Sequence, residues 1–170
     1  MENFAVTYQI NGNNNLGTGN MVKIAVFTDG GSRSNPGPGA WGFVVKVDNM
    51  VVEEYSGFLP HCTNNQAEYR GLEAACLLLA RKPKEDLTGG VDIFSDSQLI
   101  VEQINGRWKV NDLIRPYYAT AYASFVDLSK ICHVSLSWVR REFNTEADAL
   151  CNRIMDRHGV VCSRSVKRLP

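Results

Sequence analysis

The residues in this sequence best placed to do chemistry are carboxylates at the ends of predicted strands. Asp29 follows the short apolar segment Val22–Thr28, and Asp96 follows a second such segment, Val91–Ser95. Short apolar runs rich in β-branched residues are typical of buried strands. Groups at the carboxyl ends of neighbouring strands in an open sheet converge on one crevice, so we expect these two carboxylates to meet.

Two further acids, Glu68 and Asp148, lie near the starts of predicted helices. Leu72 and Ala75 follow Glu68 at helical spacing, so its side chain shares a small, apolar stripe that faces the sheet. Asp148 is beside Leu150 and borders a packed face in the same way. A buried carboxylate without a partner is unfavourable, and we therefore expect Glu68 to meet either a partner or a cation.

Four converging carboxylates predict a site for hard divalent cations. Ligands that are all oxygen favour Mg²⁺, with Mn²⁺ as the alternative. Carboxylates clustered around two such ions are used for in-line displacement at phosphorus, where water attacks and no side-chain nucleophile is needed. Taken singly, three of the acids also have a purely structural explanation. Asp29 could start an Asp-Gly turn, Asp96 could be a helix N-cap, and Asp148 could stabilise a helix dipole.

The elements that must position these acids follow from hydrophobic periodicity, caps and turn residues. Thr63 and Gln66 form a capping-box pattern, Asp48-Asn49 marks a tight turn, and Gly159 ends the last helix. The pattern predicts strands and helices in the order β-β-β-α-β-α-α-β-α, over Val22–Thr28, Ala40–Val47, Val51–Gly57, Thr63 to about Arg81, Val91–Ser95, Ser97–Asn105, Asp112–Ser129, His133–Val139 and Thr145–Arg157.

This order predicts an α/β fold. Three strands in an antiparallel meander and two parallel strands would form a five-stranded mixed sheet flanked by helices. We assign residues 21–159 to this domain, residues 1–20 to a flexible extension, and residues 160–170 to a basic C-terminal tail.

Composition narrows the class of protein but does not name a partner. With 18 basic and 18 acidic residues the net charge is zero, which neither indicates nor excludes a polyanion, since acidic ligands offset basic contacts. We find no apolar run of membrane-spanning length and no secretory signal, and we predict a cytoplasmic protein with no membrane and no obligate protein partner.

Five cysteines without a CxxC pair predict reduced thiols rather than disulfides or a zinc site.

Four segments of the chain resemble type 1 ribonuclease H, in the family's order and at family-like spacing from about Lys23 to Asp156. They are Phe27-Thr28-Asp29-Gly30-Gly31 with Asn35-Pro36-Gly37-Pro38-Gly39-Ala40-Trp41-Gly42, Thr63-Asn64-Asn65-Gln66-Ala67-Glu68, Ser95-Asp96-Ser97-Gln98, and Asn144-Thr145-Glu146-Ala147-Asp148-Ala149-Leu150. The resemblance implies an RNase H-like fold and an endonuclease that hydrolyses the RNA strand of RNA–DNA hybrids with two Mg²⁺ ions, leaving 5′-phosphate and 3′-hydroxyl ends.

The resemblance also implies the roles of particular residues. The metal-binding and catalytic residues are Asp29, Glu68, Asp96 and Asp148, and the residues that contact the hybrid are Asn35, Asn64, Asn65 and Gln98. Amide groups both donate and accept, as recognition of a ribose 2′-hydroxyl requires. Asn64 and Asn65 are also compatible with ordinary helix capping, and Asn35 with shaping of the Pro-Gly loop.

Two departures place the chain in a branch of that family. The loop before the last acid has no histidine, and Arg141 in that loop is instead a candidate phosphate contact. The basic protrusion of some members is reduced to a short stretch in which Trp108 and Lys109 match a Trp-Lys pair that would contact the DNA strand. Packing of Trp108 at a helix junction and a solvated loop at Arg141 remain the alternatives.

Two other functions fit the same fold. One is a catalytically silent module that binds hybrid or structured RNA, and the other is a DNA nuclease. Four clustered acids that face a polyanion argue against the first, and the hybrid-contacting amides argue against the second.

Overall fold

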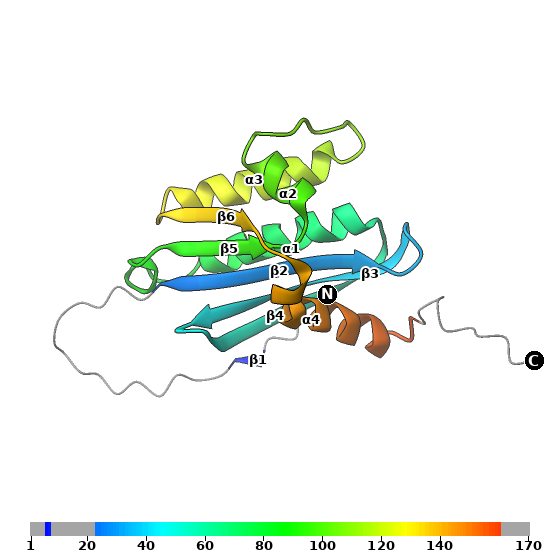
Figure 1. Ribbon diagram of the computed structural model, residues 1–170, viewed down its shortest axis with the longest axis horizontal. Helices are drawn as coiled ribbons and strands as arrows, with labels where there is room; N and C mark the ends of the chain where they lie inside the picture. Colours follow the sequence, from blue (N-terminus) through cyan, green and yellow to red (C-terminus); the bar gives the residue numbers. More distant parts are fainter. Residues whose placement is uncertain (1–5, 8–22, 161–170) are drawn as a thin grey trace, which may run out of the picture.

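The computed structural model describes residues 6–7 and 23–160, whose strands form one mixed sheet with helices on both sides (Figure 1). The strands are β1 (Val6–Thr7), β2 (Ile24–Ser32), β3 (Gly37–Val47), β4 (Met50–Cys62), β5 (Val91–Ser95) and β6 (Val134–Trp138), in the order β1-β4-β3-β2-β5-β6. The helices are α1 (Asn64–Leu79), α2 (Gln98–Ile104), α3 (Arg115–Ser129) and α4 (Thr145–Arg157), with 3₁₀ turns at Lys84–Leu87 and Arg141–Phe143.

The predicted five-stranded sheet is confirmed, and one short strand extends it. The strands β2, β3 and β4 form an antiparallel meander, and β5 and β6 add in parallel to β2. The additional strand β1 pairs antiparallel with β4 through Val6–Glu54 and Thr7–Glu53. It lies inside the segment that we predicted as a flexible extension, because two residues carry no periodic signal. The rest of that extension, and the tail beyond residue 160, lie outside the described residues.

Strand β2 runs further than the sequence predicted. We expected it to stop before the Asp29-Gly30-Gly31 segment, but pairing with β3 continues to Ser32 opposite Gly39. The predicted Asp-Gly turn at Asp29 is therefore wrong. Pairing with a neighbouring strand overrides the local turn preference of Asp-Gly.

Helices α1 and α4 pack on opposite faces of β2 and β3. Gly30 and Asp29 are neighbours on β2, so they point to opposite faces, and Gly42 on β3 pairs with Asp29 and shares its face. A Cβ atom on Gly30 would overlap the Ala67 backbone of α1, whereas a Cβ atom on Gly42 would lie 2.9 Å from the Leu150 Cβ of α4. The carboxylate of Asp29 is thereby turned toward α4.

Replacing Gly30 with Ala is expected to lower the free energy of unfolding by about 3 kcal/mol, because the new methyl group would meet backbone that cannot move aside. The overlapping atoms are the Ala67 carbonyl group and the Glu68 amide nitrogen. Gly31→Ala is the matched control, since its Cβ atom would meet nothing within 4 Å. Urea denaturation of both variants checks this expectation, and equal stability of the two would contradict it.

The helix caps follow the sequence closely, with one exception. Thr63 and Gln66 form the predicted capping box at α1, and Gly159 follows α4 with φ of +69°. The third helix was predicted from Asp112 but begins at Arg115. The side chain of Asn111 accepts a hydrogen bond from the Ile114 amide at 3.1 Å. Because this hydrogen bond holds residues 111–114 in a turn, the helix begins only after them.

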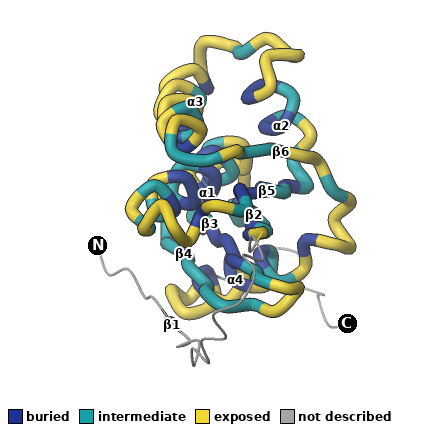
Figure 2. The backbone as a smooth tube through the Cα atoms, turned by 90° about the vertical axis from the view of Figure 1, so that its left-hand side faces the viewer, coloured by how far each residue is buried: buried dark blue, intermediate teal, exposed yellow. Residues whose placement is uncertain are grey.

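The core lies between the sheet and the inner surfaces of α1 and α3, while the outer surface of α3 is largely exposed (Figure 2). Cys62, Cys76, Cys132 and Cys151 are free thiols, as predicted, and Cys162 lies outside the described residues. Among the helices of residues 23–160, none combines the length and apolar character that crossing a bilayer requires.

Candidate active site

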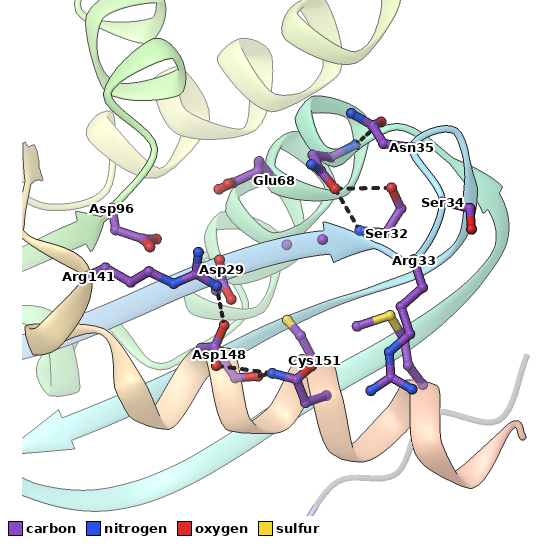
Figure 3. Close-up of a pocket in the computed structure, with 15 residues that line it drawn as sticks. Asp29, Ser32, Arg33, Ser34, Asn35, Glu68, Asp96, Arg141, Asp148 and Cys151 are labelled. Carbon is purple, nitrogen blue, oxygen red and sulfur yellow. Dashed lines mark hydrogen bonds and ion pairs between the residues drawn. The ribbon is translucent and has the colours of Figure 1, made fainter. Parts of the chain in front are cut away.

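The parallel pairing of β2 and β5 places Asp29 beside Asp96. The last pair in that register is Thr28 with Ser95, so Asp29 and Asp96 are the residues that follow this pair along the chain. A cleft of about 530 Å³ lies over this point (Figure 3). It is lined by Asp29, Gly30, Gly31, Ser32, Arg33, Ser34, Asn35, Asn64, Glu68, Asp96, Arg141, Asp148, Cys151, Asn152 and Met155. All four predicted acids therefore reach one cleft.

Three of these acids form a cluster that could hold a metal ion. Asp29, Glu68 and Asp96 each offer a carboxylate oxygen within 4.8 Å of the other two. Asp29 is 8% exposed, and neither Glu68 nor Asp29 has a basic side chain within ion-pair distance in the described part of the chain. Crowded oxygen ligands without a paired base are a chemical environment that suits a hard divalent cation.

Burial and mutual repulsion disfavour the charged forms of these acids. Burial, followed by the negative charge of Asp96, raises the pKa of Asp29 from 3.8 to about 7. Burial, and then the charges of Asp29 and Asp96, raises the pKa of Glu68 well above its usual value. The positive charge of Arg141 opposes both shifts. A bound cation would relieve the repulsion and favour the ionised carboxylates.

The stability of the metal-free protein is expected to fall between pH 5 and pH 8. The unfolded chain releases the Asp29 proton near pH 3.8, whereas the folded protein retains it up to about pH 7. The stabilisation from this group is therefore complete below pH 3.8 and lost as pH approaches 7. The expected loss from pH 5 to 8 is about 3 kcal/mol, measured by urea denaturation in EDTA. Equal stability at both pH values would argue against the raised pKa.

The fourth acid, Asp148, lies in the same cleft but is paired with neighbouring side chains. Its Oδ1 atom accepts a hydrogen bond from Arg141 Nη2 at 2.8 Å, and its Oδ2 atom accepts one from Asn152 Nδ2 at 3.0 Å (Figure 3). It is not a member of the three-acid cluster. The predicted set of four acids is therefore brought together, with one of the four held by a counter-ion.

A buried amide to which the sequence assigned no role joins two of the elements that carry these acids. Asn144, which is 0% exposed, donates from Nδ2 to the Thr28 carbonyl at 2.9 Å and to Asp96 Oδ1 at 2.8 Å. Its Oδ1 atom has no hydrogen-bond partner among the described residues. We infer that Asn144 holds the Asp96 carboxylate against β2. In the sequence, Asn144 opens the segment Asn144–Leu150 that carries the resemblance, but nothing there indicated its hydrogen-bond partners.

The loop Ser32–Asn35 is tied to the start of α1 by side-chain oxygens. Asn64 Oδ1 accepts from the Ser32 amide at 2.8 Å and from Ser32 Oγ at 3.0 Å, and Asn35 Oδ1 accepts from the Asn64 amide at 3.0 Å. Arg33 pairs with Asp156 of α4 at 2.6 Å, a link for which the sequence carried no signal. Asn35 and Asn64 thus stand in the cleft wall with their oxygens engaged.

The remaining predicted contact residues lie outside the cleft lining. Asn65, Gln98, Trp108 and Lys109 are exposed and are not among the residues that line it. The backbone carbonyl of Lys109 accepts from Gln103 Nε2 at 2.7 Å. Gln103 is itself buried and accepts a hydrogen bond from Tyr69. The exposed Trp108–Lys109 stretch is in this way anchored to the core.

The thiol of Cys151 is one of two sulfur atoms that the lining residues bring to the cleft; the other belongs to Met155. Cys151 is buried, and burial together with the charges of Asp29 and Glu68 raises the pKa of its thiol well above the usual value. Because the thiolate is the nucleophilic form, Cys151 is not a candidate nucleophile.

Together, the mixed sheet and its carboxylate cleft define an α/β protein with an acidic centre suited to divalent cations. The family model for RNase H matches residues 21–156. The chain therefore belongs to the RNase H family.

Individual relatives agree with this assignment. The bifunctional protein Rv2228c of Mycobacterium tuberculosis is 41% identical over 140 residues, and this match covers 79% of the present chain and 36% of that protein. Ribonuclease HI of Halobacterium salinarum is 36% identical over 136 residues, which cover 79% of this chain and 65% of that enzyme. The chain thus spans about a third of the mycobacterial relative and just under two thirds of the archaeal one.

A solved structure of the same family has a similar fold. LC11-RNase H1 in complex with an RNA/DNA hybrid superposes with a TM-score of 0.71 at 30% identity, and the match covers 79% of this chain and 98% of that one. The RNase H-like fold predicted from the sequence is confirmed.

Proposed function

We propose that this protein is an endonuclease that hydrolyses the RNA strand of RNA–DNA hybrids with the help of divalent cations. The observation that carries the proposal is the cluster of Asp29, Glu68 and Asp96 oxygens within 4.8 Å of one another, in a chain that belongs to the RNase H family. The complex of its relative LC11-RNase H1 with an RNA/DNA hybrid supports the choice of substrate.

The proposed cofactor is Mg²⁺, with Mn²⁺ as a substitute and two ions per site. Asp29, Glu68 and Asp96 would hold them, and Asp148 would complete the set from α4. When bound, such ions supply a Lewis acid that lowers the pKa of an attacking water and stabilises the leaving oxygen. The pKa of Asp29, raised to about 7 by burial and by Asp96, makes cation binding compete with protonation, so affinity should increase with pH.

The amides of the cleft wall are proposed to recognise the ribose. Both Asn35 and Asn64 have their side-chain oxygens engaged within the protein, and among the described residues neither amide nitrogen donates to a protein acceptor. These NH₂ groups are therefore available to donate to the 2′-hydroxyl or to phosphate oxygens. Asn65 and Gln98 would extend this contact, while Trp108 and Lys109 would contact the DNA strand.

The proposed reaction is an in-line attack of water at phosphorus. The bond that breaks joins phosphorus to the 3′-oxygen of the RNA, so the products carry a 5′-phosphate and a 3′-hydroxyl. Arg141, whose side chain is 77% exposed at the mouth of the cleft, is placed to pair with a phosphate of the substrate. The neighbouring Glu142 is exposed, and its Oε1 atom lies 3.8 Å from Arg140 Nη1.

The decisive experiment compares four labelled substrates in Mg²⁺: RNA–DNA hybrid, single-stranded RNA, duplex DNA and duplex RNA. We expect cleavage of the RNA strand of the hybrid, no cleavage in EDTA, and loss of cleavage in Asp96→Asn. Asp127→Asn is the matched control, because this exposed acid pairs with Lys130 on α3. Binding of hybrid without cleavage in Mg²⁺ or Mn²⁺ would favour a binding module, and cleavage of duplex DNA would favour a DNA nuclease.

A further inference from the structure

The pairing of Asp148 with Arg141 leaves the acidic centre one ligand short. Both carboxylate oxygens of Asp148 are engaged, Oδ1 by Arg141 Nη2 at 2.8 Å and Oδ2 by Asn152 Nδ2 at 3.0 Å. The other three acids form their cluster without it. The guanidinium therefore competes with a cation for Asp148 Oδ1.

Arg141 is well placed to release that contact. It belongs to the 3₁₀ turn Arg141–Phe143, and its side chain is 77% exposed. An ion pair with so exposed a partner contributes little stability, whereas a phosphate group offers the guanidinium two parallel hydrogen bonds. A backbone phosphate that enters the cleft therefore competes effectively with Asp148.

Arg141 also acts on the other carboxylates. Its side chain lines the same cleft as Asp29, Glu68 and Asp96, so its positive charge lies close to the three-acid cluster. A positive charge in that position opposes the binding of a second cation. Arg141 thus engages Asp148, a potential ligand, and its own positive charge repels a divalent cation.

We propose that Arg141 is a counter-ion switch. Without substrate it holds Asp148 away from the three-acid cluster and weakens cation binding. A phosphate of the hybrid then takes over the guanidinium and frees Asp148 as a ligand, so that the centre is completed when substrate is present. Arg141 is in this sense a positioning residue, and the proposal rests on the proposed function for the identity of the phosphate.

The first test uses calorimetric titration of Mn²⁺ into the protein without nucleic acid. We expect Arg141→Gln to bind Mn²⁺ about tenfold more tightly than wild type, since it removes a nearby positive charge and frees Asp148. Arg140→Gln is the matched control, because it removes the adjacent charge, which lies 3.8 Å from Glu142 and is not hydrogen-bonded to Asp148. No gain in Arg141→Gln would overturn the proposal.

A double-mutant cycle separates release of Asp148 from simple loss of charge. If Arg141 holds Asp148 away from the cation, Asp148→Asn will weaken Mn²⁺ binding more in the Arg141→Gln background than in wild type. Equal effects in both backgrounds would mean that only charge is at work, and the switch would be rejected. Neither measurement depends on cleavage, so a protein that cuts no hybrid would still give a clear answer here.

The second test asks whether a phosphate of the hybrid takes the guanidinium. Hybrid binding is followed by fluorescence anisotropy in EDTA at several salt concentrations. In Arg141→Gln we expect the slope of log affinity against log salt to decrease by about one relative to wild type. An unchanged slope would show that Arg141 meets no phosphate and would overturn the proposed release, whatever the Mn²⁺ titrations show.

Discussion

Replacing Asp29 with Asn is expected to abolish hybrid cleavage and, at the same time, to stabilise the metal-free protein. The carboxylate of Asp29 belongs to the three-acid cluster, and Asp29 is 8% exposed. Loss of a central cation ligand removes several kcal/mol of transition-state stabilisation, which corresponds to a fall in kcat of at least about 10³-fold. Single-turnover cleavage assays in saturating Mg²⁺ measure this loss.

The gain in stability follows from the cost of ionising a buried group. Because burial and Asp96 raise the pKa of Asp29 from 3.8 to about 7, ionisation of Asp29 destabilises the fold by about 4 kcal/mol at pH 8. The neutral amide of Asn avoids this cost. In EDTA, Asp29→Asn should therefore exceed wild type in unfolding free energy at pH 8, and the two should converge near pH 4.

The control for both effects is Asp127→Asn, which changes an exposed acid on α3 that pairs with Lys130. It should leave cleavage unchanged and should not alter the pH dependence of unfolding. An Asp29→Asn variant that still cleaves at a tenth of the wild-type rate would show that this carboxylate is not central. A variant less stable than wild type at pH 8 in EDTA would contradict the repulsion in the metal-free site.

The second large effect is expected at Asn144, where we predict that replacement by Ala lowers Mg²⁺ affinity by about 10- to 100-fold. Partners that orient a metal ligand have effects of this size. Its Nδ2 atom donates to Asp96 Oδ1 at 2.8 Å and to the Thr28 carbonyl at 2.9 Å. Without it the Asp96 carboxylate loses its link to β2. Calorimetric titration of Mg²⁺ measures the change.

Loss of Asn144 should also destabilise the fold, by about 2 kcal/mol, because a buried carbonyl and a carboxylate lose their donor. Asn105→Ala is the matched control. Its amide donates to the Leu136 carbonyl at 3.0 Å, and this hydrogen bond does not involve the acids. It should lose stability but retain Mg²⁺ affinity. If Asn144→Ala lost only stability, Asn144 would be a structural residue with no role in positioning Asp96.

Replacement of Asn144 by Leu makes a stricter test, because the volume of the side chain is nearly retained and the donor is lost. Leu adds no charge beside Asp96, so a change in affinity reports the missing Nδ2 donor to Asp96 Oδ1. Asn144→Leu should therefore bind Mg²⁺ as weakly as Asn144→Ala. Wild-type affinity in Asn144→Leu would contradict the proposed role of the Nδ2 donor.

The sequence by itself determined the order of strands and helices along the chain and the meeting of the acids. Apolar runs and their turn residues predicted the meander and the two parallel strands, because local periodicity records which residues face a core. The convergence of Asp29 and Asp96 followed, since parallel neighbours end at the same edge of a sheet. The capping box at Thr63 was also readable, because its two partners are three residues apart.

Only the tertiary structure decided which polar groups pair inside the cleft. Asn144 donates to a carbonyl 116 residues away and to a carboxylate 48 residues away, and the Arg141–Asp148 pair joins a 3₁₀ turn to α4. The continuation of β2 through Gly30 and Gly31 likewise depended on pairing with β3. Periodicity indicates the face on which a residue lies, whereas the partner of a hydrogen bond is set by how distant elements pack.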